Sequence, residues 1–187
     1  SGGVSVAEAD HTRAIMKKLG DVAFWRIAMR PGRPMAVGRI AATGIQAKTG
    51  SSAQPASASS YQNDINTSTG GAVLFGLPGN PVAVMVTFLA YVRPALLRMM
   101  GSTRTAPPLL RATSTEAIRK KPGRTEYQRG TVTTGPDGSL QVRTTGNQGS
   151  GVLSSMVQAN GLIVLHHQQG NVAVGDAVDV MVFDGVI

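Results

Sequence analysis

The 187-residue sequence contains no cysteine, which excludes a disulfide framework, a thiolate metal site and a cysteine nucleophile. Aromatic residues make up only 4% of the chain, and no helix-turn-helix, RNP or zinc signature is present, so nucleic-acid binding has little support. No uncharged apolar run reaches the length of about 18 residues typical of a membrane span, because Arg93 and Pro94 interrupt the most apolar segment. No signal peptide is visible either. We therefore expect no nucleic-acid partner and no membrane partner.

The sequence does contain an excess of positive charge, with 18 Lys and Arg residues against 10 Asp and Glu and a net charge of +8. With 42% hydrophobic and 15% charged residues, the chain is typical of a globular protein rather than a disordered one. The charge favours an anionic partner, best a small oxyanion or a phosphorylated cofactor, and a solvated basic surface is the alternative. The basic residues gather in two stretches: Arg26, Arg30, Arg33 and Arg39, then Arg119, Lys120, Lys121, Arg124 and Arg129.

The segment Phe-Gly-Leu-Pro-Gly-Asn-Pro at residues 75–81 is typical of a strand that turns tightly into a helix. Asn80 is a favoured N-cap residue, and Pro81 takes the first helical position, where a missing N–H costs nothing. A long apolar helix is predicted over 82–100. Backbone N–H groups at such a helix start, with the helix dipole behind them, suit a phosphate or an oxyanion. A tight turn without a ligand is the alternative.

The predicted elements divide the chain into an α/β domain over residues 1–104 and an all-β domain over 107–187. The first has helical and strand patterns in alternation, and the second has short strand-like runs separated by turns, which indicate a small barrel or sandwich. Residues 41–71, rich in small polar residues, are predicted to form a flexible insert between two hairpin strands. Before the apolar helix we predict a helix over 11–19 and strands over 22–29, 34–40 and 72–75. In the second domain we predict strands over 110–118, 126–133, 140–144, 162–166 and 177–183.

Several motifs in a fixed order resemble one known family. They are Ser-Gly-Gly-Val-Ser-Val at 1–6 with Asp10 beyond it, Phe-Trp-Arg-Ile-Ala-Met-Arg-Pro-Gly-Arg-Pro at 24–34, the 75–81 segment, Gly-Arg-Thr-Glu-Tyr-Gln-Arg-Gly at 123–130 and Gly-Asn-Gln-Gly-Ser at 146–150. Together they resemble the C-terminal half of the molybdopterin molybdenumtransferase family, the MoeA-type proteins that include the gephyrin E domain. The resemblance covers nearly the whole chain except 41–71, where the family usually has a short connection. Because the chain begins with Ser1, we expect a fragment whose α/β domain lacks its first elements.

The resemblance implies an enzyme of molybdenum cofactor biosynthesis in the cytoplasm. It implies the insertion of molybdate into adenylylated molybdopterin, with Mg²⁺-dependent cleavage of the adenylyl phosphoanhydride and release of AMP. Family members are homodimers with further N-terminal domains, so this chain alone could bind its ligands without turning over. A gephyrin-like scaffold that clusters receptors is the alternative function.

The resemblance also implies a set of site residues. The catalytic set is Asp10, Arg26, Arg30, Arg129 and Ser150. The set that binds the cofactor is Ser1, Gly2, Gly3, Ser5, Arg33, Pro78, Gly79, Asn80 and Pro81. Asp10 would also hold Mg²⁺, through one oxygen beside phosphate oxygens. Arginine suits a bidentate grip on a tetrahedral oxyanion, although the family tends to have lysine at Arg26, Arg30 and Arg33.

Each of these candidates also has a purely structural interpretation. Asp10 would be a helix N-cap, Arg26 a strand residue facing solvent, and Ser150 an ordinary turn serine. Arg129 would be a surface residue in a cross-strand pair with Glu126 or a neighbour.

Overall fold

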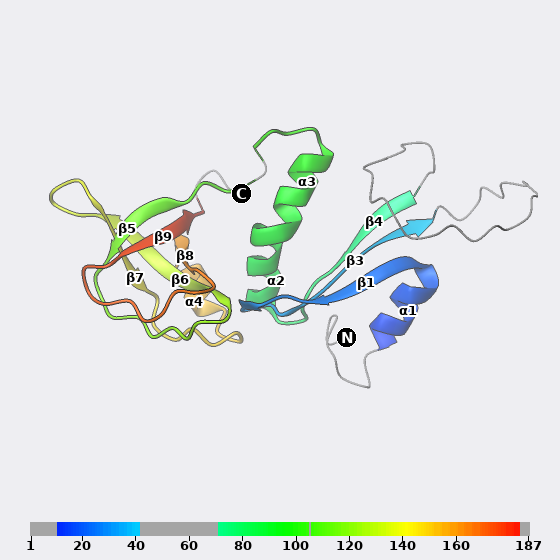
Figure 1. Cartoon of the computed structure of the whole chain (residues 1–187), viewed down its shortest axis with the longest axis horizontal. Coiled ribbons are helices and arrows are strands. Elements are labelled where there is room, and N and C mark those ends of the chain that lie inside the picture. Colours follow the sequence, from blue (N-terminus) through cyan, green and yellow to red (C-terminus); the bar gives the residue numbers. More distant parts are fainter. Residues whose placement is uncertain (1–10, 42–70, 105, 184–187) are drawn as a thin grey trace, which may run out of the picture.

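The computed structural model describes residues 11–41, 71–104 and 106–183, and these form two sheets with a long helix between them (Figure 1). The first sheet is antiparallel, with strand order β1-β3-β4. Helix α1, His11–Leu19, leads directly into β1, Gly20–Arg26, and Met16 of the helix packs near Val22. The predicted helix over 11–19 is confirmed. Its proposed cap, Asp10, lies outside the described residues.

Strands β3, Pro34–Ala41, and β4, Gly71–Gly76, pair as an antiparallel hairpin from Ala36 opposite Gly76 to Ala41 opposite Gly71. The predicted strands over 34–40 and 72–75 are therefore confirmed. The predicted flexible insert lies almost entirely in 42–70, outside the described residues, and its flexibility stays a prediction. The register nevertheless places the two ends of that segment directly opposite each other.

The predicted apolar helix runs from Pro81 to Met99 as α2 (Pro81–Thr87), the π-helical turn η1 (Phe88–Val92) and α3 (Arg93–Met99). Asn80 caps it, because its side-chain oxygen accepts the N–H of Ala83 at 3.3 Å. The π turn ends at Val92, two residues before Pro94. Proline lacks an N–H and crowds the carbonyl four residues earlier, and a wider turn relieves that crowding.

By length and mean hydropathy of 1.5, this helix could also cross a membrane. Its Val82, Val86 and Leu89 side chains are instead buried together with barrel residues, as expected for the core helix of a folded domain. The absence of a membrane partner remains a prediction.

The second sheet closes into a five-stranded barrel. Its order is β6-β7-β5-β9-β8, and β8 pairs back to β6, so the last strand meets the first. The strands are β5 (Leu110–Ser114), β6 (Thr125–Thr134), β7 (Leu140–Thr144), β8 (Gly161–Leu165) and β9 (Ala177–Val182). A short helix, α4 (Ser154–Val157), lies between β7 and β8 and was not predicted. The predicted fold class, an α/β part followed by a small all-β barrel, is confirmed.

One segment joins the two sheets. The strand predicted over 22–29 is wrong at its C-terminal end, because β1 stops at Arg26 and the N–H of Ile27 bonds to the carbonyl of Arg33 at 2.8 Å. The chain then forms β2, Met29–Arg30, which pairs in parallel with β6 of the barrel. Met29 is fully buried in a cluster that also holds α2 and barrel side chains. This core is shared between the first part of the chain and the barrel, and the predicted division into domains over 1–104 and 107–187 stays a prediction.

Candidate functional site

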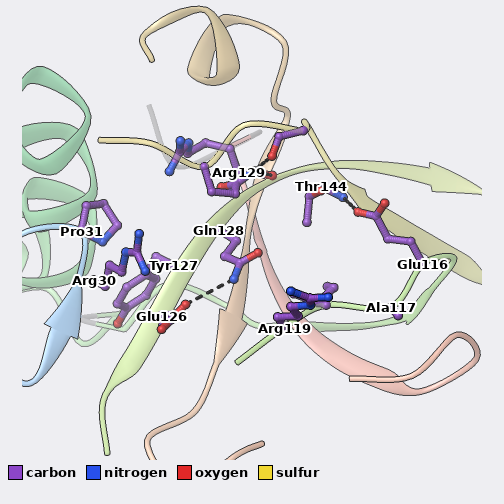
Figure 2. A pocket seen from close by; sticks show the side chains of 13 residues that line it. Arg30, Pro31, Glu116, Ala117, Arg119, Glu126, Tyr127, Gln128, Arg129 and Thr144 are labelled. Carbon is purple, nitrogen blue, oxygen red and sulfur yellow. Dashed lines mark hydrogen bonds between the residues drawn. The ribbon is translucent and has the colours of Figure 1, made fainter. Parts of the chain in front are cut away.

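A cavity of about 330 Å³ lies where β2 meets the barrel (Figure 2). It is lined by side chains from β2, from the segment after β5, from β6 and from the segment after β7. Three arginines and two glutamates give the lining a surplus of positive charge. These are Arg30, Arg119, Arg129, Glu116 and Glu126.

Strand pairing explains why distant residues meet here. The β2–β6 register sets Arg30 opposite Glu126, and Arg129 follows three residues later on β6. An isolated bridge between Ile118 and Val172 holds the segment after β5 in place, with Arg119 next to it. Both the parallel pair and the bridge join residues far apart in the sequence, so only the folded barrel brings these charges together.

Arg129 is the most constrained of these side chains, with only 1% of its surface exposed. Its Nε donates to Ser155 Oγ at 2.9 Å, and its Nη2 donates to the carbonyl of Asn147 at 3.2 Å and that of Gly149 at 2.9 Å. Nη1 has no hydrogen bond to any described residue. The structural alternative, a surface pair with Glu126, is therefore wrong, because the guanidinium turns inward toward the loop after β7.

The electrostatics of Arg129 reflect both burial and a neighbouring cation. Burial lowers the pKa of Arg129, and the nearby positive charge of Arg30 lowers it further. Two guanidinium groups that face one cavity repel each other, and an anion bound between them would remove that repulsion. The arrangement therefore favours an anionic ligand.

The two carboxylates of the cavity are already engaged. Glu126 accepts from Arg124 Nε at 2.8 Å, and Glu116 accepts the backbone N–H of Thr144 at 2.6 Å. Burial, and then the neighbouring Tyr91, raise the pKa of Tyr127 to about 12, so its phenol stays protonated at neutral pH. The lining thus offers cations and a neutral hydroxyl to an incoming anion, with its acidic groups held by other partners.

Arg129 forms hydrogen bonds to the loop of residues 146–150 through both its main chain and its side chain. Gln148 accepts the N–H of Arg129 at 2.8 Å and donates to its carbonyl at 3.0 Å. Gly146 and Gln148 line the cavity, whereas Ser150 is exposed and is not among the lining residues. Arg129 therefore positions this loop as well as contributing charge.

The remaining predicted residues are distributed more widely. Arg33 lines a second cavity, and Arg26, which is exposed, lines an apolar hollow beside Trp25. The 78–81 segment lines neither charged cavity among the described residues, although Asn80 caps the helix as predicted. Five candidates lie outside the described residues: Ser1, Gly2, Gly3, Ser5 and Asp10.

Sequence reasoning missed part of the lining. Glu116 belongs to no motif, so no signal in the sequence could have found it, and Arg119 was noted only as a member of the second basic stretch. Tyr127, Gln128 and Gln148 stood inside the 123–130 and 146–150 motifs, and attention to the whole motif would have included them. Within 11–41, 71–104 and 106–183, no group of three His, Asp or Glu side chains could hold a metal ion.

Comparison with known proteins assigns both parts of the chain. Residues 1–98 match the family described as a probable molybdopterin binding domain, and residues 111–183 match the MoeA C-terminal region (domain IV). The chain is 35% identical to a molybdopterin molybdenumtransferase from Haemophilus influenzae over its whole length, and 29% identical over 95% of its length to gephyrin from Dictyostelium discoideum. It spans only 39% and 24% of those two proteins.

The fold agrees with these matches. A crystal structure of a molybdopterin biosynthesis MoeA protein from Pyrococcus horikoshii superimposes with a TM-score of 0.61 at 23% identity, covering 94% of this chain and 35% of that protein. The matched family models cover both the α/β part and the barrel, in the order that the motifs suggested. The chain therefore belongs to the MoeA-type family of molybdopterin-binding proteins.

Proposed function

We propose that this chain serves as a molybdopterin molybdenumtransferase in molybdenum cofactor biosynthesis, inserting molybdate into adenylylated molybdopterin with release of AMP. The observation that carries the proposal is the cavity in which Arg30 from β2 and Arg129 from β6 face the same space with surplus positive charge. The name of the 35% identical relative supports the same activity.

Molybdate is a tetrahedral dianion, and the arginines of the cavity would bind it by charge-assisted hydrogen bonds. Arg30 is exposed, and no described residue forms an ion pair with it, so its guanidinium would be the one to grip an oxyanion. Arg129 has two of its three nitrogens occupied, so only Nη1 remains for a ligand. Arg30 is thus the gripping residue, and Arg129 supplies charge and holds the 146–149 loop.

The catalytic effect would be electrostatic. Fixed cations in a partly enclosed cavity stabilise charge that develops during exchange of the molybdate oxygens, and they need no rearrangement at that moment. They also hold the oxyanion in one orientation toward the pterin, which reduces the entropic cost of the reaction. The 78–81 turn and the start of α2 would bind the phosphate of the pterin, because helix N-termini attract anions.

Three finer features belong to the same proposal. The protein acts in the cytoplasm, forms a homodimer and uses Mg²⁺. Asp10, which lies outside the described residues, would hold the metal. Binding without turnover is the second possibility for this chain, because it spans 39% of the length of its bacterial relative.

The test measures molybdate binding by calorimetry for the chain and for Arg30→Gln. Loss of a charged hydrogen bond costs about 1.5–3 kcal/mol, so we expect affinity to fall about 10- to 100-fold. Arg143→Gln, an exposed arginine on β7 outside the cavity, should bind molybdate like the unaltered chain. Equal affinity in Arg30→Gln and the unaltered chain would contradict the proposal.

A second measurement separates binding from turnover. Adenylylated molybdopterin, molybdate and Mg²⁺ are incubated with the chain, and AMP release is followed. Release above the protein-free rate supports the transferase, and molybdate binding without release supports a binding role. Capture of a receptor-loop peptide without any molybdate binding would favour the gephyrin-like scaffold, which the 29% identity to gephyrin brings into consideration.

A further inference from the structure

Asn160 closes the barrel seam between β6 and β8 with its side chain. The register of the two strands ends with Gly130 opposite Gly161, whereas β6 continues beyond that pair. Past this point the Asn160 amide takes the place of a strand. Its Oδ1 accepts the N–H of Val132 at 2.7 Å, and its Nδ2 donates to the carbonyl of Val132 at 2.8 Å. One side chain therefore pairs with both backbone groups of Val132, as a neighbouring strand would.

The backbone of Asn160 is bonded at the same seam. Its N–H donates to the carbonyl of Gly130 at 3.2 Å, and its carbonyl accepts the N–H of Phe183, the residue after β9, at 2.9 Å. Asn160 is nevertheless exposed at the barrel surface. Side-chain and main-chain hydrogen bonds therefore hold in place a residue that water can reach.

The residue after Asn160 has to be glycine. A Cβ on Gly161 would lie 2.9 Å from the carbonyl oxygen of Met181, which is closer than side chains in proteins approach. Strand β9 thus excludes a larger residue at this position. Asn160 is also the only asparagine in the sequence that precedes a glycine. Barrel closure therefore fixes an Asn-Gly pair, because the amide is needed on β6 and the glycine lets β9 approach.

An asparagine that precedes glycine is prone to deamidation, because glycine has no side chain to hinder the attack. In this reaction the backbone nitrogen of the glycine attacks the side-chain carbonyl carbon of the asparagine. A C–N bond forms in a five-membered succinimide, and the amide nitrogen leaves as ammonia with the proton of the attacking nitrogen. Water then opens the ring at either carbonyl and gives aspartate or isoaspartate. The reaction consumes one water and involves no oxidation or reduction.

We propose that Asn160 is a deamidation site that the closed barrel protects and that opening of the β6–β8 seam makes reactive. Ring closure requires the side-chain carbonyl carbon to turn toward the nitrogen of Gly161, and the two hydrogen bonds to Val132 hold it toward β6 instead. The reaction therefore proceeds from molecules in which these bonds are broken, and its rate follows the population of that open state. The inference is independent of the proposed transferase activity, since it uses none of the residues that line the first cavity.

The product of deamidation cannot restore the seam. An aspartate at this position has no N–H to donate, so a carboxylate oxygen would face the carbonyl of Val132, where Nδ2 lies at 2.8 Å. The isoaspartate product also inserts a methylene group into the main chain, which displaces the hydrogen bonds to Gly130 and Phe183. Deamidation is thus a one-way step that weakens barrel closure along β6, the strand that carries Arg129.

The experiment follows deamidation of the whole chain at neutral pH, folded in buffer and unfolded in urea, by peptide mass spectrometry. Trypsin leaves residues 144–187 as one peptide, because this stretch contains no Lys or Arg, and the peptide includes Asn147, Asn160 and Asn171. We expect Asn160 to react faster than the other two in urea, and at least about tenfold more slowly in the folded chain than in urea. Ile163→Val, which removes a methyl group from β8 inside the barrel, should raise the folded-state rate several-fold.

Two matched variants test the effect on the fold, since both add the same charge. Asn160→Asp should lower the Tm in thermal unfolding. Asn147→Asp should not, because among the described residues the Asn147 side chain bonds only through Oδ1, which accepts the N–H of Gly149, and aspartate keeps that oxygen. A Tm of Asn160→Asp equal to that of the unaltered chain would refute the weakening of the seam.

The deamidation measurement uses the unaltered sequence, so it decides the proposal even where Asn160→Asp does not fold. Equal rates for Asn160 in the folded and the unfolded chain would overturn the proposal, because the barrel would then give no protection. A rate for Asn160 in urea no higher than that of Asn147 would also overturn it, because the Asn-Gly pair would then not be a reactive site.

Discussion

Replacement of Arg129 by alanine should lower the free energy of unfolding, because the side chain is buried and hydrogen-bonded. The guanidinium makes three hydrogen bonds, and the one to Ser155 lies between side chains that are both at most 2% exposed. Loss of the guanidinium leaves the buried Ser155 hydroxyl with only its bond to the carbonyl of Val152. It also removes the donor that the carbonyls of Asn147 and Gly149 share. Hydrogen bonds of charged groups contribute about 1.5–3 kcal/mol each, but the two carbonyls lie near solvent and can bind water instead. We expect a loss of about 3 kcal/mol in the free energy of unfolding.

The assay is urea unfolding of Arg129→Ala, Arg129→Lys and Arg143→Ala. For a chain of this size, 3 kcal/mol corresponds to a fall in Tm of about 6–12 °C. Arg129→Lys keeps the charge and one donor group, so its free energy of unfolding should fall less than that of Arg129→Ala. Arg143→Ala, on the exposed face of β7, should change the free energy of unfolding by less than about 0.5 kcal/mol. A loss below about 1 kcal/mol in Arg129→Ala would refute the structural role, and Arg129 would then be available to act on ligand alone.

Three further predictions address other parts of the fold. Gly32→Ala should lower Tm by several degrees in thermal unfolding, because Gly32 has φ +94° and an added Cβ would lie 2.3 Å from Thr87 Oγ1. Asp179→Asn should reduce the loss of unfolding free energy as the pH falls from about 5 to about 2, measured by urea unfolding. Hydrogen bonds from Arg111 and His166 lower the pKa of the Asp179 carboxyl in the folded protein. The carboxylate therefore stabilises the fold above its unfolded pKa, and this stabilisation is lost as the pH falls through its folded pKa. Replacing residues 42–70 by Asn-Gly should leave Tm within about 4 °C, since the hairpin register already brings the two ends together.

Local patterns predicted most of the secondary structure. The helix over 11–19, the hairpin strands and the five barrel strands follow from apolar periodicity bounded by turn residues, which depends on near neighbours only. The strand predicted over 110–118 is wrong at its C-terminal end, because β5 stops at Ser114. The Asn80 cap and Pro81 are local signals of the same kind. The strand end at Arg26 and the two-residue β2 were missed, because they depend on pairing with β6 about a hundred residues later in the chain.

The candidate site was predictable to a smaller extent. Arg30 and Arg129 stood in motifs and the structure brings them to one cavity, but Arg33, predicted beside Arg30, lines the other. The turn through Gly32 reverses the chain between them, and a positive φ of +94° at one residue is a conformational detail that no charge pattern reveals. The buried state of Arg129 was equally hidden, since arginine in a strand is usually exposed.

The sequence by itself determined the family and the order of the elements, because these follow from ordered motifs and short-range periodicity. Its net charge of +8 predicts an anionic partner, which stays a prediction. Only the tertiary structure decided which charges share a space. Closure of the barrel through β6 and β8, and the parallel pairing of β2 with β6, place cations from distant segments around two separate cavities. The physical reason is that charges act over distances of a few ångströms, and those distances are set by long-range strand pairing that a linear pattern does not contain.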